Sequence, residues 1–229
     1  MFSGKTTPRT FDDVRGLVSN LPMADAEALS AARDREAKLT KPAGALGRLE
    51  ELVAWLSAWQ GRHPPQLVHA QALVFAGNHG VTAQGISAFP AEVTAQMVTN
   101  FAAGGAAINQ LARAYGADLR VIPLDLDRPT MDFTAAPAMS EEECMLAFAT
   151  GGRAVRTNSD IVLVGEMGIG NTTSAAALCR LLLGGTSADW AGPGTGLDDA
   201  GIARKIEVID RAVELHGADA IDPLESLRR

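Results

Sequence analysis

Short apolar runs that alternate with helical segments constrain the fold of this chain more than any other feature. Each run has the length and the continuous apolar character of a strand buried on both faces of a sheet. The runs are "ALVFAG" (72–77), "LRVIPLDL" (119–126) and "DIVLVG" (160–165). Helical patterns occupy the segments between and after them, at 90–116, 139–155, 172–183 and 198–216. Since helices join consecutive parallel strands, this order predicts an α/β fold, a Rossmann-like three-layer arrangement with a parallel sheet flanked by helices.

The residues before the first strand pattern are helical in character. Residues 11–36 show polar, amphipathic patterns that Asn20-Leu21-Pro22 interrupts, and a further helix with an apolar stripe ends at Gly61. Trp55 and Trp59 lie one turn apart on that helix, a spacing more typical of packing than of binding.

Composition and charge exclude several classes of function. A formal net charge of −7 without a Lys/Arg run argues against nucleic acid or an anionic membrane as the partner. No apolar run is long enough to span a bilayer, and the opening "MFSGKTTPRTFDDVRG" lacks the apolar core of a signal peptide. Cys144 and Cys179 lie far apart without neighbouring metal ligands. We therefore expect reduced thiols in a cytoplasmic protein, with no disulfide framework or zinc site.

A glycine-rich turn, "GEMGIGNTT" (165–173), follows the third strand pattern and leads into a helix. Glycines allow positive φ and close backbone approach, and a helix start offers free N–H groups to an anion, so phosphate is the natural occupant. The Gly-Lys-Ser/Thr of a Walker A loop is missing. A plain turn capped by Asn171 or Thr172 is the alternative, and the spacing leaves both interpretations open.

Glu166 comes one residue after the predicted strand, where a carboxylate could reach the crevice at the sheet edge. There it could accept a proton or stabilise positive charge that develops during a reaction. The alternative is a carboxylate satisfied by nearby backbone donors, and the residues alone do not decide between the two.

A second candidate anion site is "AGPGTGLDDAGIARK" (191–205), in which three glycines precede a helix. Lys205 lies two turns into that helix and could direct its ammonium toward a phosphate, although a solvated surface lysine is the commoner case. For Asp198 and Asp199, helix capping is a better interpretation than magnesium binding, because no strand leads into the segment.

The segment "AGNHGVTAQGISAFPAEVTAQMV" (76–98) carries polar residues that could orient a heteroaromatic ring. Ser87 and Gln96 are the candidates for that role, with Phe89 as an apolar wall. His79 could act as a base, but a histidine that organises a turn by hydrogen bonding is more common.

Four stretches in this order resemble one enzyme family. They are "KLTKPAGALGRLEELVAWLSAWQ", "ALVFAGNHGVTAQGISAFPAEVTAQMVTNFAAGGAAINQLAR", "GEMGIGNTTSAAAL" and "GPGTGLDDAGIARKIEVI". From about Lys38 onward the chain is similar to the nicotinate-nucleotide–dimethylbenzimidazole phosphoribosyltransferases, glycosyltransferases of cobalamin biosynthesis. The resemblance implies transfer of phosphoribose from nicotinate mononucleotide to 5,6-dimethylbenzimidazole, which yields α-ribazole 5′-phosphate and nicotinate. It also implies a homodimer that needs no metal ion and no cofactor.

The same resemblance implies a domain division and a set of site residues. Residues 1–60 would contribute to a small helical subdomain, and residues 61–229 would form the α/β nucleotide- and base-binding domain. The family's 5′-phosphate site matches Gly168, Asn171, Thr172, Gly194 and Lys205. Its benzimidazole pocket matches Ser87, Gln96 and Met167, and Glu166 matches an active-site carboxylate close to the ribose and the acceptor base.

Two departures from the family pattern keep alternatives open. Asn78 stands where many relatives carry Asp. The chain ends at "DPLESLRR", whereas family members continue into a Gly-Glu-Gly-Thr-Gly-like segment that carries the general base. A non-catalytic nucleotide-binding module, or an inactive fragment without that glutamate, is therefore the alternative function. A P-loop-like kinase is disfavoured because the Walker lysine is missing.

Overall fold

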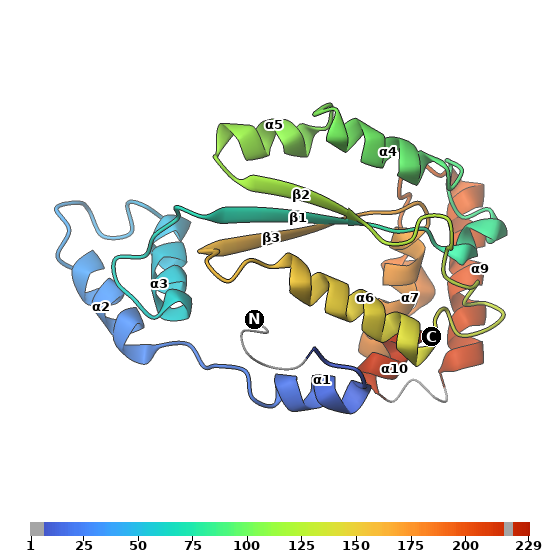
Figure 1. Cartoon of the computed structure of the whole chain (residues 1–229), viewed down its shortest axis with the longest axis horizontal. Coiled ribbons are helices and arrows are strands. Elements are labelled where there is room, and N and C mark those ends of the chain that lie inside the picture. Colours follow the sequence, from blue (N-terminus) through green and yellow to red (C-terminus); the bar gives the residue numbers. More distant parts are fainter. Residues whose placement is uncertain (1–6, 218–221) are drawn as a thin grey trace.

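A computed structural model describes residues 7–217 and 222–229 of the chain (Figure 1). Part of the opening sequence from which we predicted the absence of a signal peptide, residues 1–6, lies outside this range. Within the described residues, no helix combines the length and the apolar character needed to cross a lipid bilayer.

The strands form a parallel sheet, as predicted. β1 (Ala70–Ala76) is central, between β2 (Asp118–Pro123) and β3 (Ile161–Met167). In this register Phe75 of β1 lies opposite both Ile122 and Glu166, so the three strands end at the same edge of the sheet.

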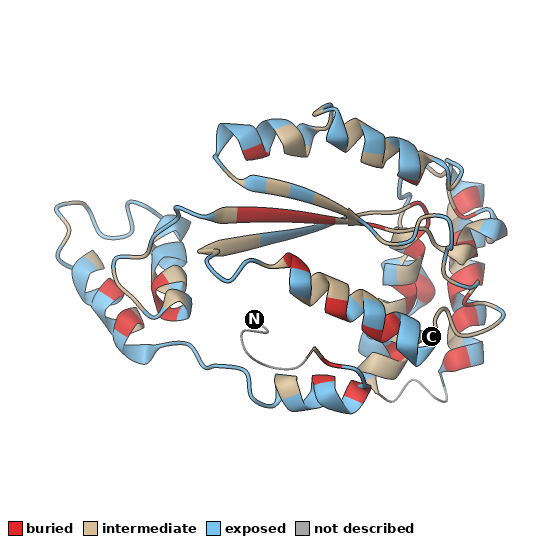
Figure 2. Cartoon of the chain, viewed as in Figure 1, coloured by how far each residue is buried: buried red, intermediate tan, exposed pale blue. Residues whose placement is uncertain are grey.

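Only the central strand is buried as the sequence pattern suggested (Figure 2). The prediction that all three strands are buried on both faces was wrong for β2 and β3, which are edge strands within the described residues. Leu163 and Val164 of β3 are 49% and 73% exposed. The continuous apolar run that predicts a strand does not reveal whether a neighbour covers its outer side.

Helices cover both faces of the sheet and confirm the three-layer α/β architecture (Figure 1). α4 (Val93–Ala102) and α5 (Ala107–Ala114) lie on one face, and α6 (Glu141–Ala154) lies on the other. Ser140 and Glu143 form a capping box at the start of α6, which satisfies backbone donors there. The single helix expected over 90–116 is divided because the chain turns at Gly104, whose φ is 80°.

The carboxyl ends of the strands lead toward the helices that close the right-hand end of the molecule in Figure 1. α7 (Asn171–Leu183) follows β3, and α9 (Asp199–His216) packs against α7. Three short helices were not predicted: η1 (Gly80–Gln84), α8 (Ser187–Trp190) and α10 (Pro223–Arg228).

A hydrophobic cluster holds η1, α7 and α9 together behind the strand ends. Its buried members are Val81, Ile86, Phe133, Ala176, Ala177, Val208, Ile209 and Ala212. Because η1 directly follows β1 and α7 directly follows β3, this cluster fixes the two turns between them relative to each other.

The N-terminal helices lie in two places. α1 (Phe11–Val18) packs on α6 and α10 through a cluster of Phe11, Val14, Cys144 and Met145. α2 (Ala26–Glu36) and α3 (Arg48–Gln60) pair with each other beyond the amino ends of the strands (Figure 1). The division at residue 60 remains a prediction, but α1 belongs with the α/β layers by its contacts.

The expected packing of the two tryptophans was wrong for the described chain. Trp55 and Trp59 are 51% and 55% exposed, while the buried residues of α3 are small, Ser57 and Ala58. Both tryptophans line an open cavity between α2 and α3, so about half of each side chain remains accessible to solvent.

Candidate active site

The turn after β3 requires glycine at two positions. β3 extends to Met167, so Glu166 lies within the strand rather than one residue beyond it, and its side chain is exposed. A Cβ atom at Gly168 would lie 2.4 Å from the carbonyl oxygen of Gly77, closer than any real contact. Gly170 has a φ of 93°, in the region that favours glycine.

The start of α7 is open to an outside anion. Its N-cap is Gly170, and no side chain caps the helix, so the alternative interpretation, a turn capped by Asn171 or Thr172, was wrong. The start of a helix carries the positive end of the helix dipole. Two N–H groups here already donate within the turn, that of Asn171 to the Gly168 carbonyl at 3.1 Å and that of Thr173 to the Gly170 carbonyl at 3.0 Å, so the dipole is the main attraction for an anion. Thr172 is exposed in this first turn, and Asn171 is partly buried beside it.

Lys205 joins the second glycine segment to this helix start. Its Nζ donates to Thr172 Oγ1 at 2.8 Å and to the carbonyl oxygen of Gly192 at 3.2 Å. A Cβ atom at Gly194 would lie 3.2 Å from Thr172 Oγ1 and 3.8 Å from Lys205 Nζ. Three of the predicted phosphate-site residues, Thr172, Gly194 and Lys205, are therefore in mutual contact.

The ammonium of Lys205 is buried, so the interpretation as a solvated surface lysine was wrong. The residue is 1% exposed, and it takes part in none of the ion pairs among the described residues. Burial lowers the pKa of Lys205 below its ordinary value. A buried cation that faces a hydroxyl and a carbonyl is costly unless an anion compensates it, which makes this site suited to a phosphate.

The aspartates beside this lysine have structural positions. Asp198 is the N-cap of α9 and accepts a hydrogen bond from the Gly201 N–H at 2.8 Å, as predicted, while Asp199 is the first helical residue. Among the described residues, no group of three His, Cys, Asp or Glu side chains is arranged to hold a metal ion.

The segments that carry Ser87 and Gln96 attach to the same end of the sheet. Arg204 donates to the Gly85 carbonyl at 3.0 Å, and the Ile169 N–H donates to Thr94 Oγ1 at 3.2 Å. The first contact ties the Ser87 loop to α9, and the second ties α4, which carries Gln96, to the glycine turn. The Ser87 hydroxyl accepts from the Phe89 N–H within its own loop, and Gln96 is exposed on α4.

Asn78 forms a side-chain hydrogen bond that an aspartate at the same position could not form. Its Nδ2 donates to the Leu126 carbonyl at 2.9 Å, which ties the turn after β1 to the segment after β2. An ionised carboxylate has no donor and could not form this bond.

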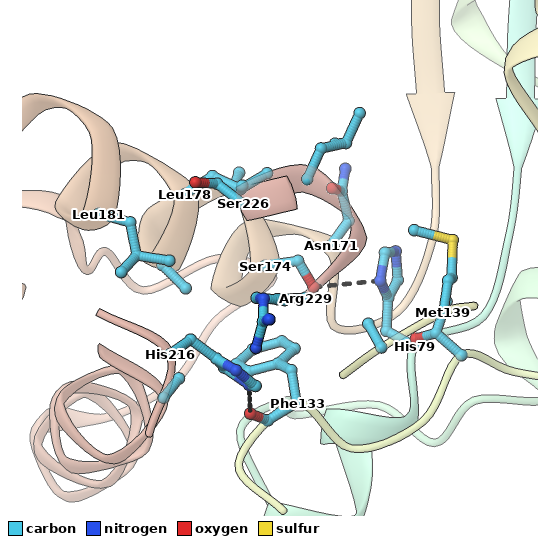
Figure 3. A pocket seen from close by; sticks show the side chains of 16 residues that line it. His79, Phe133, Met139, Asn171, Ser174, Leu178, Leu181, His216, Ser226 and Arg229 are labelled. Carbon is cyan, nitrogen blue, oxygen red and sulfur yellow. Dashed lines mark hydrogen bonds between the residues drawn. The ribbon is translucent and has the colours of Figure 1, made fainter. Parts of the chain in front are cut away.

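His79 has a partner that sequence reasoning did not find. Its Nδ1 lies 3.1 Å from Ser174 Oγ in the first turns of α7 (Figure 3). Both side chains line a cavity of about 250 Å³ that runs along α7 toward α9 and α10. The cavity includes Asn171, but Glu166, Ser87, Gln96 and Lys205 do not line it.

Comparison with known proteins finds relatives along nearly the whole chain. A sequence model for a family described as "Phosphoribosyltransferase" matches residues 21–229. The nicotinate-nucleotide–dimethylbenzimidazole phosphoribosyltransferase of Novosphingobium aromaticivorans is 59% identical over 213 residues, which cover 93% of this chain and 63% of that protein. A Ruegeria sp. protein of the same name is 58% identical over 219 residues, 96% of this chain and 65% of that protein.

Solved structures give the same result for the fold. CobT from Thermus thermophilus superposes with a TM-score of 0.80 at 39% sequence identity, over 88% of this chain and 66% of that chain. The chain thus spans a little under two thirds of the length of the curated relatives it matches.

Proposed function

Because the chain belongs to the nicotinate-nucleotide–dimethylbenzimidazole phosphoribosyltransferase family, we propose that it serves the reaction for which its relatives are named. In that reaction, phosphoribose passes from nicotinate mononucleotide to 5,6-dimethylbenzimidazole, which gives α-ribazole 5′-phosphate and nicotinate for cobalamin biosynthesis. The observation that carries the proposal is the contact of Lys205 with both glycine segments at the uncapped start of α7.

The 5′-phosphate is proposed to bind at this contact. The start of α7 brings the positive end of the helix dipole to the backbone around Gly168, Asn171 and Thr172, and the Lys205 ammonium supplies a full positive charge beside Gly194. The charge of a phosphate dianion offsets the cost of the buried ammonium. The geometry therefore favours a phosphorylated ligand over a neutral nucleoside.

The acceptor base is proposed to lie toward Ser87, Gln96 and Met167. Met167 ends β3 directly before the glycine turn, and the other two reach this end of the sheet through the Gly85–Arg204 and Thr94–Ile169 contacts. A ring held there would lie at the strand end that also carries Glu166.

Glu166 is proposed to stabilise positive charge during the transfer. Cleavage of the bond between ribose C1′ and the pyridinium nitrogen of nicotinate mononucleotide passes through an oxocarbenium-like state, which a nearby carboxylate favours. Nicotinate leaves with the bonding electrons, so the leaving group needs no proton. The attacking benzimidazole nitrogen forms the new bond to C1′, and the other ring nitrogen loses its proton to a general base. By resemblance, that base is a glutamate of the segment that family members carry beyond the residues present here.

A second candidate function is nucleotide binding without transfer. The contacts around Lys205 would serve binding of a phosphorylated ligand whether or not transfer follows.

One experiment separates the two candidates. The purified chain is incubated with nicotinate mononucleotide and dimethylbenzimidazole, and α-ribazole phosphate is sought by mass spectrometry. Formation of the product supports transfer, and binding of the mononucleotide by calorimetry without product supports the binding module. Absence of both excludes both proposals.

A cytoplasmic homodimer is also proposed. The exposed apolar residues on α3, with Trp55 and Trp59 among them, supply surface that a partner could cover. Light scattering of the purified chain at several concentrations tests the oligomeric state, and a monomer at all concentrations would exclude the dimer for this chain.

A further inference from the structure

The turns after β1 and β3 are in direct contact. β1 and β3 are parallel neighbours, and the Gly77 N–H donates to the Met167 carbonyl at 3.1 Å where the two strands end. A Cβ at Gly168 would collide with the Gly77 carbonyl. The backbone that leads to the proposed phosphate site therefore rests on the backbone that carries His79.

The His79 ring fills the space that the glycines leave. A Cβ at Gly168 would lie 3.2 Å from His79 Nε2, and a Cβ at Gly170 would lie 3.1 Å from His79 Cβ. On its other side, the ring directs Nδ1 to the Ser174 hydroxyl at 3.1 Å (Figure 3). The His79 side chain thus lies against the turn at two glycines, with its ring at Gly168 and its Cβ at Gly170, and it contacts the helix that the turn begins.

His79 is itself held in place. Its carbonyl oxygen accepts hydrogen bonds from the Thr82 N–H at 3.1 Å and from Thr82 Oγ1 at 2.9 Å, in the first turn of η1. Val81, which also belongs to η1, packs in one hydrophobic cluster with Ala176 and Ala177 of α7. Side chain and backbone of His79 are therefore both anchored to elements that flank the turn.

We propose that His79 is a positioning residue for the anion site, holding the Gly168–Thr172 backbone, through Ser174 and the two glycines, in the conformation that binds a nucleotide 5′-phosphate. The inference rests on the proposed function. A turn that contains Gly168 and Gly170 has many conformations in isolation, so a bound phosphate would have to order it at a cost in affinity. A packed ring that selects one conformation in advance removes part of that cost.

The contacts of His79 argue against a role as the general base. Nδ1 lies within hydrogen-bond distance of the Ser174 hydroxyl. Nε2 lies so close to Gly168 that the ring of the acceptor base would not fit between them. Burial lowers the pKa of His79, which favours the neutral form of the ring.

The test compares binding of a phosphorylated and an unphosphorylated ligand. Affinities for nicotinate mononucleotide and for nicotinate riboside are measured by calorimetry on the full chain. The variants are His79→Ala, His79→Asn, Ser174→Ala and the double variant with both alanines. His79→Asn retains an amide that can bond to Ser174, and His69→Ala, an exposed histidine before β1, is the matched control.

We expect His79→Ala to weaken mononucleotide binding by about tenfold, equivalent to about 1.4 kcal/mol. His79→Asn should recover most of that loss, and the riboside affinity should change little in any variant. Ser174→Ala should weaken mononucleotide binding in the same direction, and the double variant should lose less than the product of the two single losses, because the two side chains act as one unit.

Two results would overturn the inference while the proposed function stands. One is wild-type mononucleotide affinity in His79→Ala. The other is an equal loss for the mononucleotide and the riboside in His79→Asn, which would indicate a general structural defect. Failure of the unmodified chain to bind the mononucleotide would instead overturn the proposed function, and the inference with it.

Discussion

The Nζ of Lys205, on α9, donates a hydrogen bond to Oγ1 of Thr172, in the first turn of α7, at 2.8 Å. This contact joins two glycine-rich segments that are 33 positions apart at these residues. It also places a buried positive charge at an uncapped helix start, so the two features reinforce each other in attracting an anion.

Replacement of Lys205 by methionine should separate ligand binding from folding. Lys205→Met keeps the length of the side chain and removes the charge, so mononucleotide affinity should fall by at least about tenfold, the magnitude expected for one charge-assisted hydrogen bond. Calorimetric titration measures the loss, with Lys38→Met, at an exposed lysine after α2, beside it as the control. Undiminished affinity in Lys205→Met would contradict the phosphate assignment.

The same variant tests how the burial of Lys205 makes the free energy of unfolding depend on pH. Burial lowers the pKa of Lys205 below 10.5, so between the folded pKa and 10.5 the unfolded chain binds more protons than the folded chain. The contribution of Lys205 to the free energy of unfolding therefore rises as the pH increases from the folded pKa to 10.5. Below the folded pKa, the ammonium is charged in both states and the full cost of burying it destabilises the fold. Urea unfolding should show Lys205→Met more stable than the unmodified chain at pH 7, with a gap that narrows toward pH 10.5. A gap that is constant with pH would contradict this.

Gly168→Ala should damage the turn directly. The added methyl group would meet the Gly77 carbonyl oxygen at 2.4 Å, and a backbone atom cannot turn aside as a flexible side chain can. We expect destabilisation of about 1–3 kcal/mol and a larger relative loss of mononucleotide binding. Gly151→Ala in α6 is the control, because a Cβ there meets nothing within 4 Å. Equal behaviour of the two variants in thermal unfolding and binding would exclude the steric argument.

Glu166→Gln should lower the rate of transfer without affecting the fold. The side chain is exposed, so its amide analogue should leave the melting temperature unchanged. If the carboxylate stabilises the oxocarbenium-like state, kcat should fall on the order of 100-fold while KM for the mononucleotide changes little. The assay is the mass-spectrometric rate of product formation, with Glu207→Gln as the control. Unchanged turnover in Glu166→Gln would show that this carboxylate has no catalytic role.

Asn78→Asp should loosen the turn after β1. The amide donor to the Leu126 carbonyl would be replaced by an acceptor that faces another acceptor, a loss of about 1–3 kcal/mol when such a group is buried. Urea unfolding measures the change, and protonation of the new carboxyl at low pH should restore part of the stability. Equal stability of both forms at neutral pH would mean that the Leu126 contact contributes little.

The sequence predicts those parts of the fold and the site that depend on local patterns. The β1 and β3 runs, the glycines that follow them and the Asp198 cap are all encoded within a few neighbouring residues. The break at Gly104 was missed because apolar residues continue at helical spacing across it. The contacts that create the site could not be predicted from local patterns either. Lys205 is buried against Thr172 and Gly192, and Ser174 contacts His79, which is 95 positions away in the sequence. Such pairings are set by how α7, α9 and η1 pack, which no single segment specifies.

The outer side of β3 has a practical consequence for handling this protein. Leu163 and Val164 project from a strand whose free amides and carbonyls no described residue pairs, and this combination is a template for adding strands from other molecules. Concentrated samples should therefore become turbid through β-rich aggregates that bind thioflavin. A lysine in place of Val164 should delay their appearance, since charge on an edge strand opposes further strand addition.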